Sequence, residues 1–412
     1  MQLRPILSSL QHHKVTVALL ILQVALTCAI ECNIGFIMVN SVDRITRISG
    51  VAEDELSLID SRDIGSDQNN HAQQVADLTA LRTIPGVIAA AAVDSLPLGG
   101  DESTYGICSS KEDLARVMAA RSFEHIPGCV QPSEYDGSPD EIKALGLQLI
   151  AGRDFSSEEY FTDGNAPTLI MSRSLAERLY PRQNALGRIV YTGAGNPIRV
   201  VGIVDTLLRP RLREPKVDQF AMLWPQWPGN DGVTYLLRSQ AQDRERVLKA
   251  AVGALMRINP NRIIPSTGIR TFAQMRSQYF QHDMTMISLL LTCGFALLFV
   301  TALGIAGLAN FWVQQRKRHI GIRRAIGATR GDILCYFQTE NFLVVTFGVI
   351  PGMLLAYALN TLLMRHYELS RLPLYYLPLG AVILWLLGQL AVLGPALRAA
   401  AVPPIAATRL MD

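Results

Sequence analysis

Four long stretches of apolar side chains divide the chain. They cover residues 15–39, 284–313, 341–364 and 372–397; the first contains one charged residue, Glu31, and the others contain none. A membrane-spanning helix needs about 20 apolar residues, so each stretch is long enough to cross a bilayer. Burial inside a soluble domain is the weaker alternative, because buried helices of soluble proteins rarely carry more than about 14 apolar residues in a row.

The first stretch has two further alternatives. A cleaved signal peptide has an apolar region of about 7–15 residues and a small-residue cleavage site, and this stretch is longer and lacks such a site. A lipoprotein anchored at Cys28 or Cys32 is disfavoured by the residues that precede them, Thr27 and Glu31. We therefore expect a first spanning helix.

Basic residues predict the orientation of the spans. Loops on the cytoplasmic side of a membrane are enriched in Lys and Arg, and the loop after the second stretch combines six bases with one acid, Asp332. We expect this loop and both termini in the cytoplasm, which places residues 41–283 outside. The six bases are Arg316, Lys317, Arg318, Arg323, Arg324 and Arg330.

The segment outside is expected to fold as an α+β domain. Short strand patterns at 86–93, 167–171, 199–205, 220–224 and 233–237 are interspersed with helical patterns at 174–180 and 242–258, and such mixing favours α+β over a sandwich. Two stretches, 59–70 and 127–139, look loop-rich, and an inserted second lobe is expected around 95–135.

The predicted fold is therefore an α-helical membrane protein with four transmembrane helices and a large α+β extracytoplasmic domain between the first two. Its expected parts are a cytoplasmic N-terminus with the first helix (1–40), the outer domain (41–283), the second helix (284–313), a cytoplasmic coupling loop (314–335), the third helix (336–364), an outer loop (365–374), the fourth helix (375–397) and a cytoplasmic tail (398–412).

Charge and cysteine usage add two expectations about the outer segment. Residues 41–283 hold 26 Lys and Arg against 30 Asp and Glu, a net charge of −4, which disfavours a nucleic-acid partner. Cys108 and Cys129 are the only cysteines of this segment, and an oxidising compartment permits a disulfide. We predict a Cys108–Cys129 bond; two free buried thiols are the alternative.

Common catalytic motifs are missing from the sequence. It contains no G-x-x-x-x-G-K-[ST] phosphate loop, no G-x-S-x-G elbow, no H-E-x-x-H and no C-x-x-C, and no pair of acids has a spacing that indicates acid–base work. We therefore predict neither an enzyme nor a metal or cofactor site.

A polar stripe marks the first spanning helix. Gln23, Thr27 and Glu31 recur every four residues and so share one helix face. A charged side chain at the bilayer centre costs roughly 2.5–3.5 kcal/mol, so the stripe should face protein or water. It predicts a helix-packing seam or part of a cargo-facing cavity; the alternative is that Glu31 reaches the outer interface.

Small residues indicate further packing faces. Gly304 and Gly307 lie in the second span, and Gly348 and Gly352 form a small-xxx-small pair in the third. Such residues let helix backbones approach closely. In the loop at 314–334, apolar residues alternate with arginines, which suits a short amphipathic helix at the inner surface; simple positive-inside anchoring is the alternative.

That loop resembles the conserved segment of the MacB/FtsX family of ABC transporter permeases. The family pattern R-x-x-E-I-G-I-R-R-A-L/I-G-A, followed by D-I, is matched from Arg316 to Ile333, and an acid, Glu340, opens the next span. Residues 152–155, 170–188 and 200–204 resemble the family's periplasmic core domain, and 395–409 resembles its C-terminal motif.

The resemblance implies a transport subunit that has no ATPase of its own. The residues implied in ATPase coupling are Arg316, Ile320, Gly321, Ile322, Arg323, Arg324, Gly327, Ala328 and Asp332. A separate ATP-binding subunit would bind the ATP, a second permease protomer would complete a homo- or heterodimer, and a periplasmic adaptor could join them at the inner membrane. Two positions depart from the family pattern, His319 in place of Glu and Pro403 in place of Asp, and both bear on the coupling.

Three functions are considered, two of them within this family and one from another class. The first is efflux of a peptide, drug or similar cargo through mechanotransmission, in which ATP hydrolysis moves the outer domain. A permease that releases lipoproteins or regulates cell-wall hydrolases is the second. The third, from another class, is a membrane-anchored sensor or scaffold, which the short cytoplasmic segments disfavour.

Overall fold

The computed structural model describes residues 14–63, 70–123, 126–161, 167–213, 215, 217–229, 232–367 and 372–401. They form two compact units. One combines Met1–Ile45 with Asp283–Asp412, and the other is Thr46–His282.

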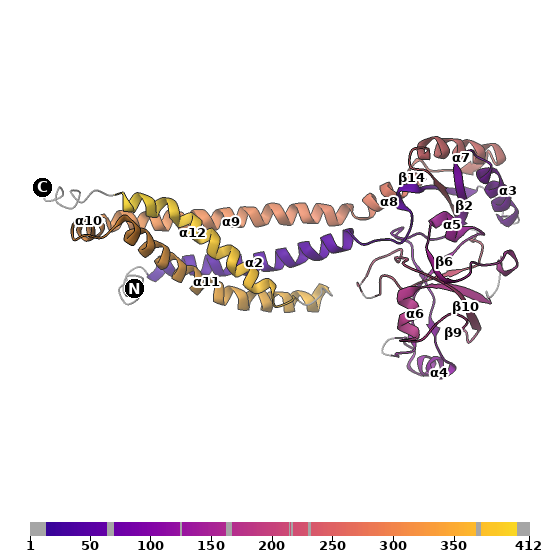
Figure 1. Ribbon diagram of the computed structural model, residues 1–412, viewed down its shortest axis with the longest axis horizontal. Helices are drawn as coiled ribbons and strands as arrows, with labels where there is room; N and C mark the ends of the chain where they lie inside the picture. The colour runs from indigo at the N-terminus through magenta and orange to yellow at the C-terminus, as the bar shows by residue number, and fades with distance from the viewer. Residues whose placement is uncertain are drawn as a thin grey trace. The chain divides into compact units, whose positions relative to one another are not determined.

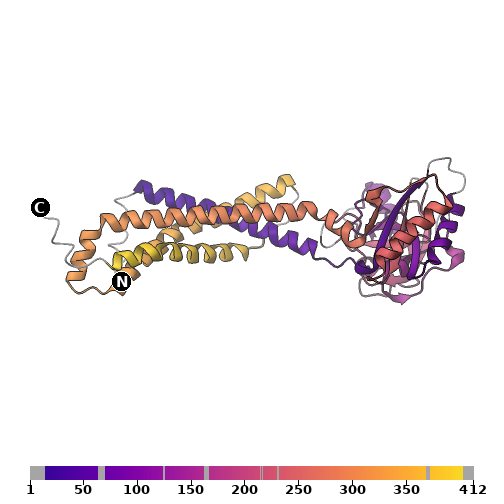
Figure 2. The same cartoon turned by 90° about the horizontal axis from the view of Figure 1, so that it is seen from above.

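The first unit is helical. In the described residues its helices are α2 (Lys14–Ile45), α9 (Gln281–Gln315), α10 (Lys317–Ala325), α11 (Arg330–Tyr367) and α12 (Tyr376–Ala400). All except α10 are long and apolar enough to cross a membrane, which confirms the four predicted spans. Figure 1 labels these helices, and Figure 2 shows α9 as one continuous helix.

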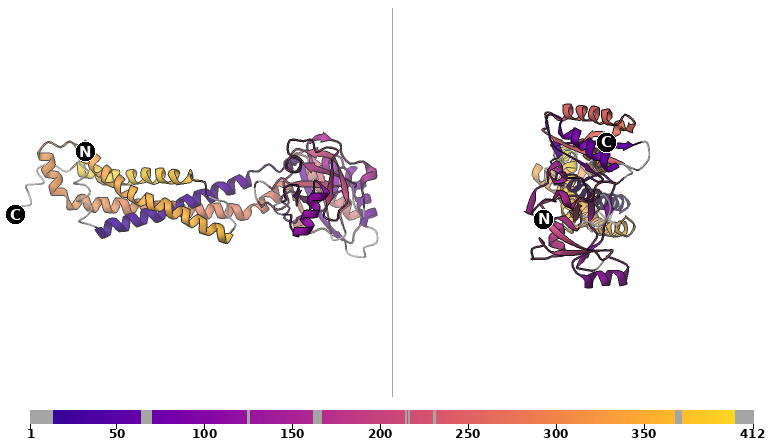
Figure 3. Two further views of the ribbon diagram at one scale, coloured as in Figure 1. Left: turned by 90° about the horizontal axis from the view of Figure 1, so that it is seen from below. Right: turned by 90° about the vertical axis from the view of Figure 1, so that its right-hand side faces the viewer.

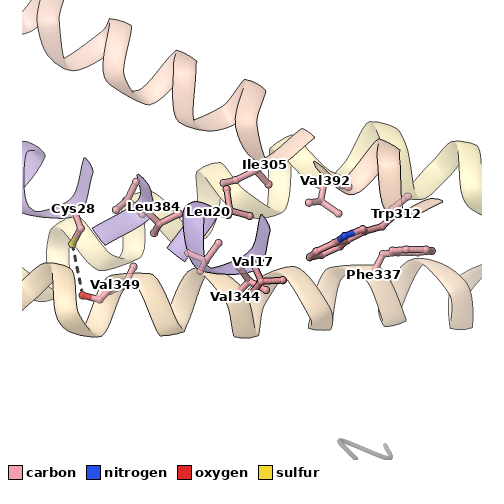
Figure 4. Packing of buried hydrophobic residues seen from close by; sticks show 14 of the residues in the cluster. Val17, Leu20, Cys28, Ile305, Trp312, Phe337, Val344, Val349, Leu384 and Val392 are labelled. Atoms are coloured by element: carbon pink, nitrogen blue, oxygen red, sulfur yellow. Dashed lines mark hydrogen bonds between the residues drawn. The ribbon is translucent and has the colours of Figure 1, made fainter. Parts of the chain in front are cut away.

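Three of the long helices pack closely. The nearest backbone approaches in this unit are those of α2, α11 and α12 with one another, whereas α9 contacts them mainly through side chains. Figure 4 shows the core they enclose, with Trp312 of α9 beside Phe337 of α11 and Val349 accepting a bond from the Cys28 thiol. Lipid supplies no hydrophobic drive between helices, so such close packing is what holds these spans together.

The second unit contains two sheets. The smaller has the order β13-β1-β12-β2, with β14 also on β1. Its strands are β1 (Leu56–Asp63), β2 (Val87–Val93), β12 (Val233–Ser239), β13 (Arg262–Ile263) and β14 (Ile269–Thr271). The larger has the order β3-β6-β11-β8-β10-β9-β4-β5, with β7 also on β10. Its strands are β3 (Ser103–Thr104), β4 (Ile107–Cys108), β5 (Cys129–Val130), β6 (Ser133–Asp136), β7 (Leu149–Gly152), β8 (Thr168–Ser172), β9 (Ile189–Thr192), β10 (Pro197–Val204) and β11 (Ala221–Trp224).

Short helices cover these sheets, so the predicted α+β class is confirmed. Helices α3 and α7 pack on one face of the smaller sheet and α5 on the strands β2 and β12, while α6 lies against β8 and β10 of the larger (Figure 1). The helices are α3 (Asn70–Arg82), α4 (Lys111–Ala120), α5 (Glu141–Leu145), α6 (Arg173–Leu179), α7 (Arg244–Ile258), α8 (Phe272–Tyr279) and the 3-10 turns η1 (Glu53–Glu55), η2 (Ser157–Glu159) and η3 (Ser266–Gly268). Figure 3 gives two further views.

Two sequence expectations about the outer unit are wrong. The stretches 59–70 and 127–139, expected as loops, contain the end of β1 and the strands β5 and β6; 64–69 lie outside the described residues. The end of β1 and β6 are mostly polar, so they carry no apolar alternation, and pairing with β12 and β11 is what makes them strands. The strand β5 has only two residues and pairs with β4. The strands of the larger sheet also extend along the chain from β3 at Ser103 to β11 at Trp224, well beyond the expected lobe at 95–135.

One apolar core joins the two sheets. Leu58 and Leu236 of the smaller sheet belong to the same buried cluster as Tyr135, Ile170 and Leu223 of the larger. Each of these residues is 0% exposed, because the inner faces of both sheets turn toward each other. The outer unit therefore has a shared interior rather than two independent lobes.

A group of acids lies where β2 meets β6. The Asp136 N–H donates to Asp94 Oδ1 (3.1 Å), and Asp136 Oδ1 is buried without a hydrogen-bond partner among the described residues. Burial raises the pKa of Asp136 to about 8, and the nearby carboxylates of Asp94 and Glu134 add to the rise. No ion pair among the described residues includes any of these three acids. The repulsion between their carboxylates is therefore not offset by a nearby base.

We expect this group to make the protein less stable as pH rises. A carboxyl whose pKa is raised on folding binds its proton more tightly in the native state than in the unfolded state. Its contribution to the free energy of unfolding is therefore fully present below the unfolded pKa of about 4 and is lost as the pH rises through about 8. Asp136→Asn should therefore raise the unfolding temperature at pH 8 by about 2–4 °C and leave it unchanged at pH 4. Scanning fluorimetry of the full chain measures this, with the exposed Glu112→Gln as control; an equal shift at both pH values would contradict it.

Candidate coupling segment and polar seam of the spans

The loop between the second and third spans folds into the short helix α10. The helix ends where Gly327 adopts φ +108°, a left-handed conformation that favours glycine. The Gly327 and Ala328 N–H groups donate to the carbonyls of Arg324 and Arg323 (both 3.1 Å), which satisfies the end of the helix. The glycine in the predicted coupling pattern thus turns the chain from α10 toward α11.

A reciprocal cap starts the next helix. Asp332 N–H donates to Thr329 Oγ1 (3.2 Å), and Thr329 N–H donates to Asp332 Oδ2 (2.9 Å). This exchange satisfies free donors at the start of α11. Asp332, predicted as a coupling residue, has this capping role inside the segment.

A buried ion pair ties the segment to the third span. Arg316, at the junction of α9 and α10, places Nη1 3.0 Å from both carboxylate oxygens of Glu340. The Glu340 side chain is 1% exposed and that of Arg316 is 20% exposed. The Arg316 guanidinium also lies over the Trp312 ring, 5.7 Å from its centroid. This pair fixes the start of α10 relative to α9 and α11.

The two faces of α10 differ in what they contact. Ile320 and Gly321 are buried, and Ile320 joins the core of the spans. The opposite face exposes Ile322 (43% exposed) and Ile326 (81%), with Arg323 beside them over the Tyr336 ring (5.0 Å to the centroid). An exposed isoleucine flanked by arginines is the kind of small apolar centre with a charged rim that protein interfaces use.

The structure therefore divides seven of the nine predicted coupling residues into two groups, and the other two, Arg324 and Ala328, are half-buried. Arg316, Ile320, Gly321, Gly327 and Asp332 shape and anchor the segment, whereas Ile322 and Arg323 face outward. Ile326 and Glu340 stood in the quoted pattern but were not named as site residues. Glu340 could have been found by its charge, because a lone acid at the edge of a span needs a nearby base.

The two departures from the family pattern are placed differently. His319 lies on the exposed part of α10, where it adds a polar group to the outward surface. Pro403 lies outside the described residues, as does the rest of the C-terminal motif from residue 402 on, whereas its first residues belong to α12.

The polar stripe of α2 faces α9. Thr27 and Thr301 share a hydrogen bond between their buried hydroxyls (2.8 Å), and Gln23 Nε2 donates to the Val300 carbonyl (3.3 Å). Glu31 lies against Gly294, where a Cβ would come within 3.2 Å of Oε2. The first two residues thus form a packing seam, and the glycine makes room for the third.

The predicted small-residue faces fit against α2. A Cβ at Gly348 would lie 2.7 Å from Val24 Cβ, and one at Gly352 would lie 2.7 Å from Cys28 Cβ. In α9, Gly304 leaves room for the Gln23 amide in the same way, whereas Gly307 has open space. Gly348 and Gly352 therefore allow the close approach of α11 to α2.

In the outer unit, the structure contains a disulfide between Cys108 and Cys129. It joins the neighbouring strands β4 and β5 and closes a loop that includes α4. A link over 21 residues restricts the unfolded chain, which stabilises the fold. Within the described residues no group of three or more His, Cys, Asp or Glu could hold a metal ion.

The chain is similar in sequence to known ABC transporter permeases. Residues 291–404 match the FtsX-like permease C-terminal family. The chain is 25% identical over 308 residues to the uncharacterized ABC transporter permease YknZ of Bacillus subtilis, covering 72% of this chain and 76% of YknZ. It is 27% identical over 233 residues to the macrolide export ATP-binding/permease protein MacB of Agrobacterium fabrum, covering 54% of this chain and 34% of MacB.

A solved structure is also similar. The extracellular domain of YknZ from Gram-positive bacteria aligns in full with 51% of this chain, at 17% identity and a TM-score of 0.32. The chain spans about a third of the length of the MacB proteins it matches.

The resemblance drawn from the loop and the spans is thus confirmed. The chain is a multi-pass membrane protein with an FtsX-like permease domain, and it is homologous to the YknZ and MacB ABC transporter permeases.

Proposed function

We propose that this chain is the permease subunit through which a separate ATP-binding subunit moves an extracytoplasmic domain. The observation that supports this most directly is the outward face of α10. Ile322, Arg323 and Ile326 are exposed there, while the buried Arg316–Glu340 pair holds the helix to the spans. Movement of a partner bound to this face would therefore be transmitted to α9 and α11, because α10 is fixed to both helices.

The route from that face to the outer unit follows the packing. Movement of α11 reaches α2 through the close contacts at Gly348 and Gly352. Helices α2 and α9 lead directly into the chain at either end of the outer unit. We infer that ATP binding and hydrolysis by the partner change the arrangement of the spans and hence of the outer unit, without chemistry in this chain.

The same proposal includes orientation and assembly. The base-rich segment 314–335 and both termini face the cytoplasm of a cell whose inner membrane holds the spans, and the outer unit lies in the periplasm. Two protomers, identical or different, each bind one ATP-binding subunit, and a periplasmic adaptor can complete the path. The cargo is a peptide, a drug or a similar molecule handled at the outer face.

Two measurements test the proposal. Protease added to intact spheroplasts should digest residues 41–283 and spare 314–334; the reverse pattern would overturn the orientation. Purification of the tagged full chain from its own membranes, followed by mass spectrometry, should recover an ATP-binding subunit. Recovery of a cytoplasmic signalling protein instead would favour the sensor or scaffold function.

A further inference from the structure

A cavity of about 180 Å³ lies beside Glu31 between α2, α9 and α12. It forms where α9 stands away from the close packing of the other three spans. Most of its lining is apolar and includes Phe295, Leu298, Tyr376 and Ile383. Phe295 (65% exposed) and Ile383 (45%) stand at its edge, so the cavity opens toward the hydrocarbon of the bilayer.

Among the described residues that line this cavity, Glu31 is the single charged one. Its Oε1 is buried and has no hydrogen-bond partner in the described part of the chain. A carboxylate without a partner is costly in hydrocarbon, and intramembrane acids usually pair with another group. Gln23 and Thr27 of the same stripe do find partners on α9, so Glu31 alone in the stripe lacks one.

We propose that this cavity binds a lipophilic ammonium ion that enters from the bilayer. The cation pairs with the Glu31 carboxylate, and its hydrocarbon part fills the apolar space between Phe295, Leu298 and Tyr376. Charge complementarity selects this occupant, because a neutral lipid tail would leave the carboxylate without a partner. The site requires the spans but no ATP-binding subunit, so it goes beyond the proposed function and can be tested apart from it.

Photolabelling tests the site. The probe is decylammonium with a diazirine at its chain end, added to the purified full chain in nanodiscs of zwitterionic lipid, and mass spectrometry reads the labelled peptides of α2, α9 and α12. We expect labelling of these peptides that excess decylammonium blocks and excess decanol does not. Glu31→Gln keeps the size of the side chain and should lower this labelling about tenfold, which corresponds to about 1.4 kcal/mol.

Two glycine variants separate filling of the cavity from general disturbance of the spans. A Cβ would meet no atom within 4 Å at either Gly35, which lines the cavity, or Gly307, which does not. Gly35→Leu should abolish the amine-specific labelling, and the matched Gly307→Leu should preserve it. Labelling of α11 peptides by lipid-dissolved probe is the internal control.

Three results would overturn the proposal. Equal competition by decanol and decylammonium would mean an apolar site with a neutral Glu31. Unchanged labelling in Glu31→Gln would remove the role of the carboxylate. Absence of labelling on α2, α9 and α12, with α11 labelled, would mean that a second copy or a bound lipid covers the cavity.

Discussion

We expect reversal of two charges, Arg323→Glu with Arg324→Glu, to leave the protein in the membrane and to abolish stimulation of its ATP-binding partner. Arg323 is exposed on α10 and lies over the Tyr336 ring, beside the exposed Ile326. Placing like charges opposite each other at an interface costs several kcal/mol. ATPase activity of the reconstituted complex should therefore fall to the level of the isolated subunit, at least about tenfold below the wild-type complex.

A second variant distinguishes docking from damage to the fold. Ile326 is 81% exposed, so Ile326→Asp removes an apolar contact of the outward face without creating a cavity. It should reduce the stimulation as well, whereas Ile48→Asp, at a 77% exposed isoleucine of the outer unit, should not. Full stimulation by both the double arginine variant and Ile326→Asp would show that α10 is not the docking surface.

The second large effect concerns stability. Arg316→Ala should destabilise the protein by about 3–5 kcal/mol, because it leaves the Glu340 carboxylate buried at 1% exposure without its guanidinium. Thermal unfolding of the purified chain and its steady-state amount in membranes should both fall. A loss of this size lowers cellular abundance several-fold.

A paired substitution tests the physical reason. Replacing both partners, Arg316→Met with Glu340→Met, removes the charge along with its partner, and such exchanges are often neutral or stabilising. We expect this double variant to recover most of the stability lost in Arg316→Ala. If it is as unstable as the single variant, packing around Arg316, including its contact with Trp312, outweighs the ion pair.

Some features were predictable because they depend only on the residues of one contiguous segment. An apolar run such as 284–313 identifies a span whatever surrounds it, since its length alone matches the bilayer. The helix 242–258 was equally readable from its amphipathic pattern, and the structure has α7 at Arg244–Ile258. By contrast, β6 (Ser133–Asp136) carries too few apolar residues to show in the pattern.

The sequence by itself determined that four helices cross a membrane, that an α+β domain lies between the first two, and that an arginine-rich segment joins the second and third. The tertiary structure alone decided that Arg316 pairs with Glu340, that Ile326 faces outward, and that Glu31 borders a cavity. The tertiary structure also decided the division into two sheets, because β1 pairs with β12, which follows it in the sequence after most of the outer unit. Apolar runs reflect the solvent around one segment, whereas pairings between distant residues depend on how the whole chain packs.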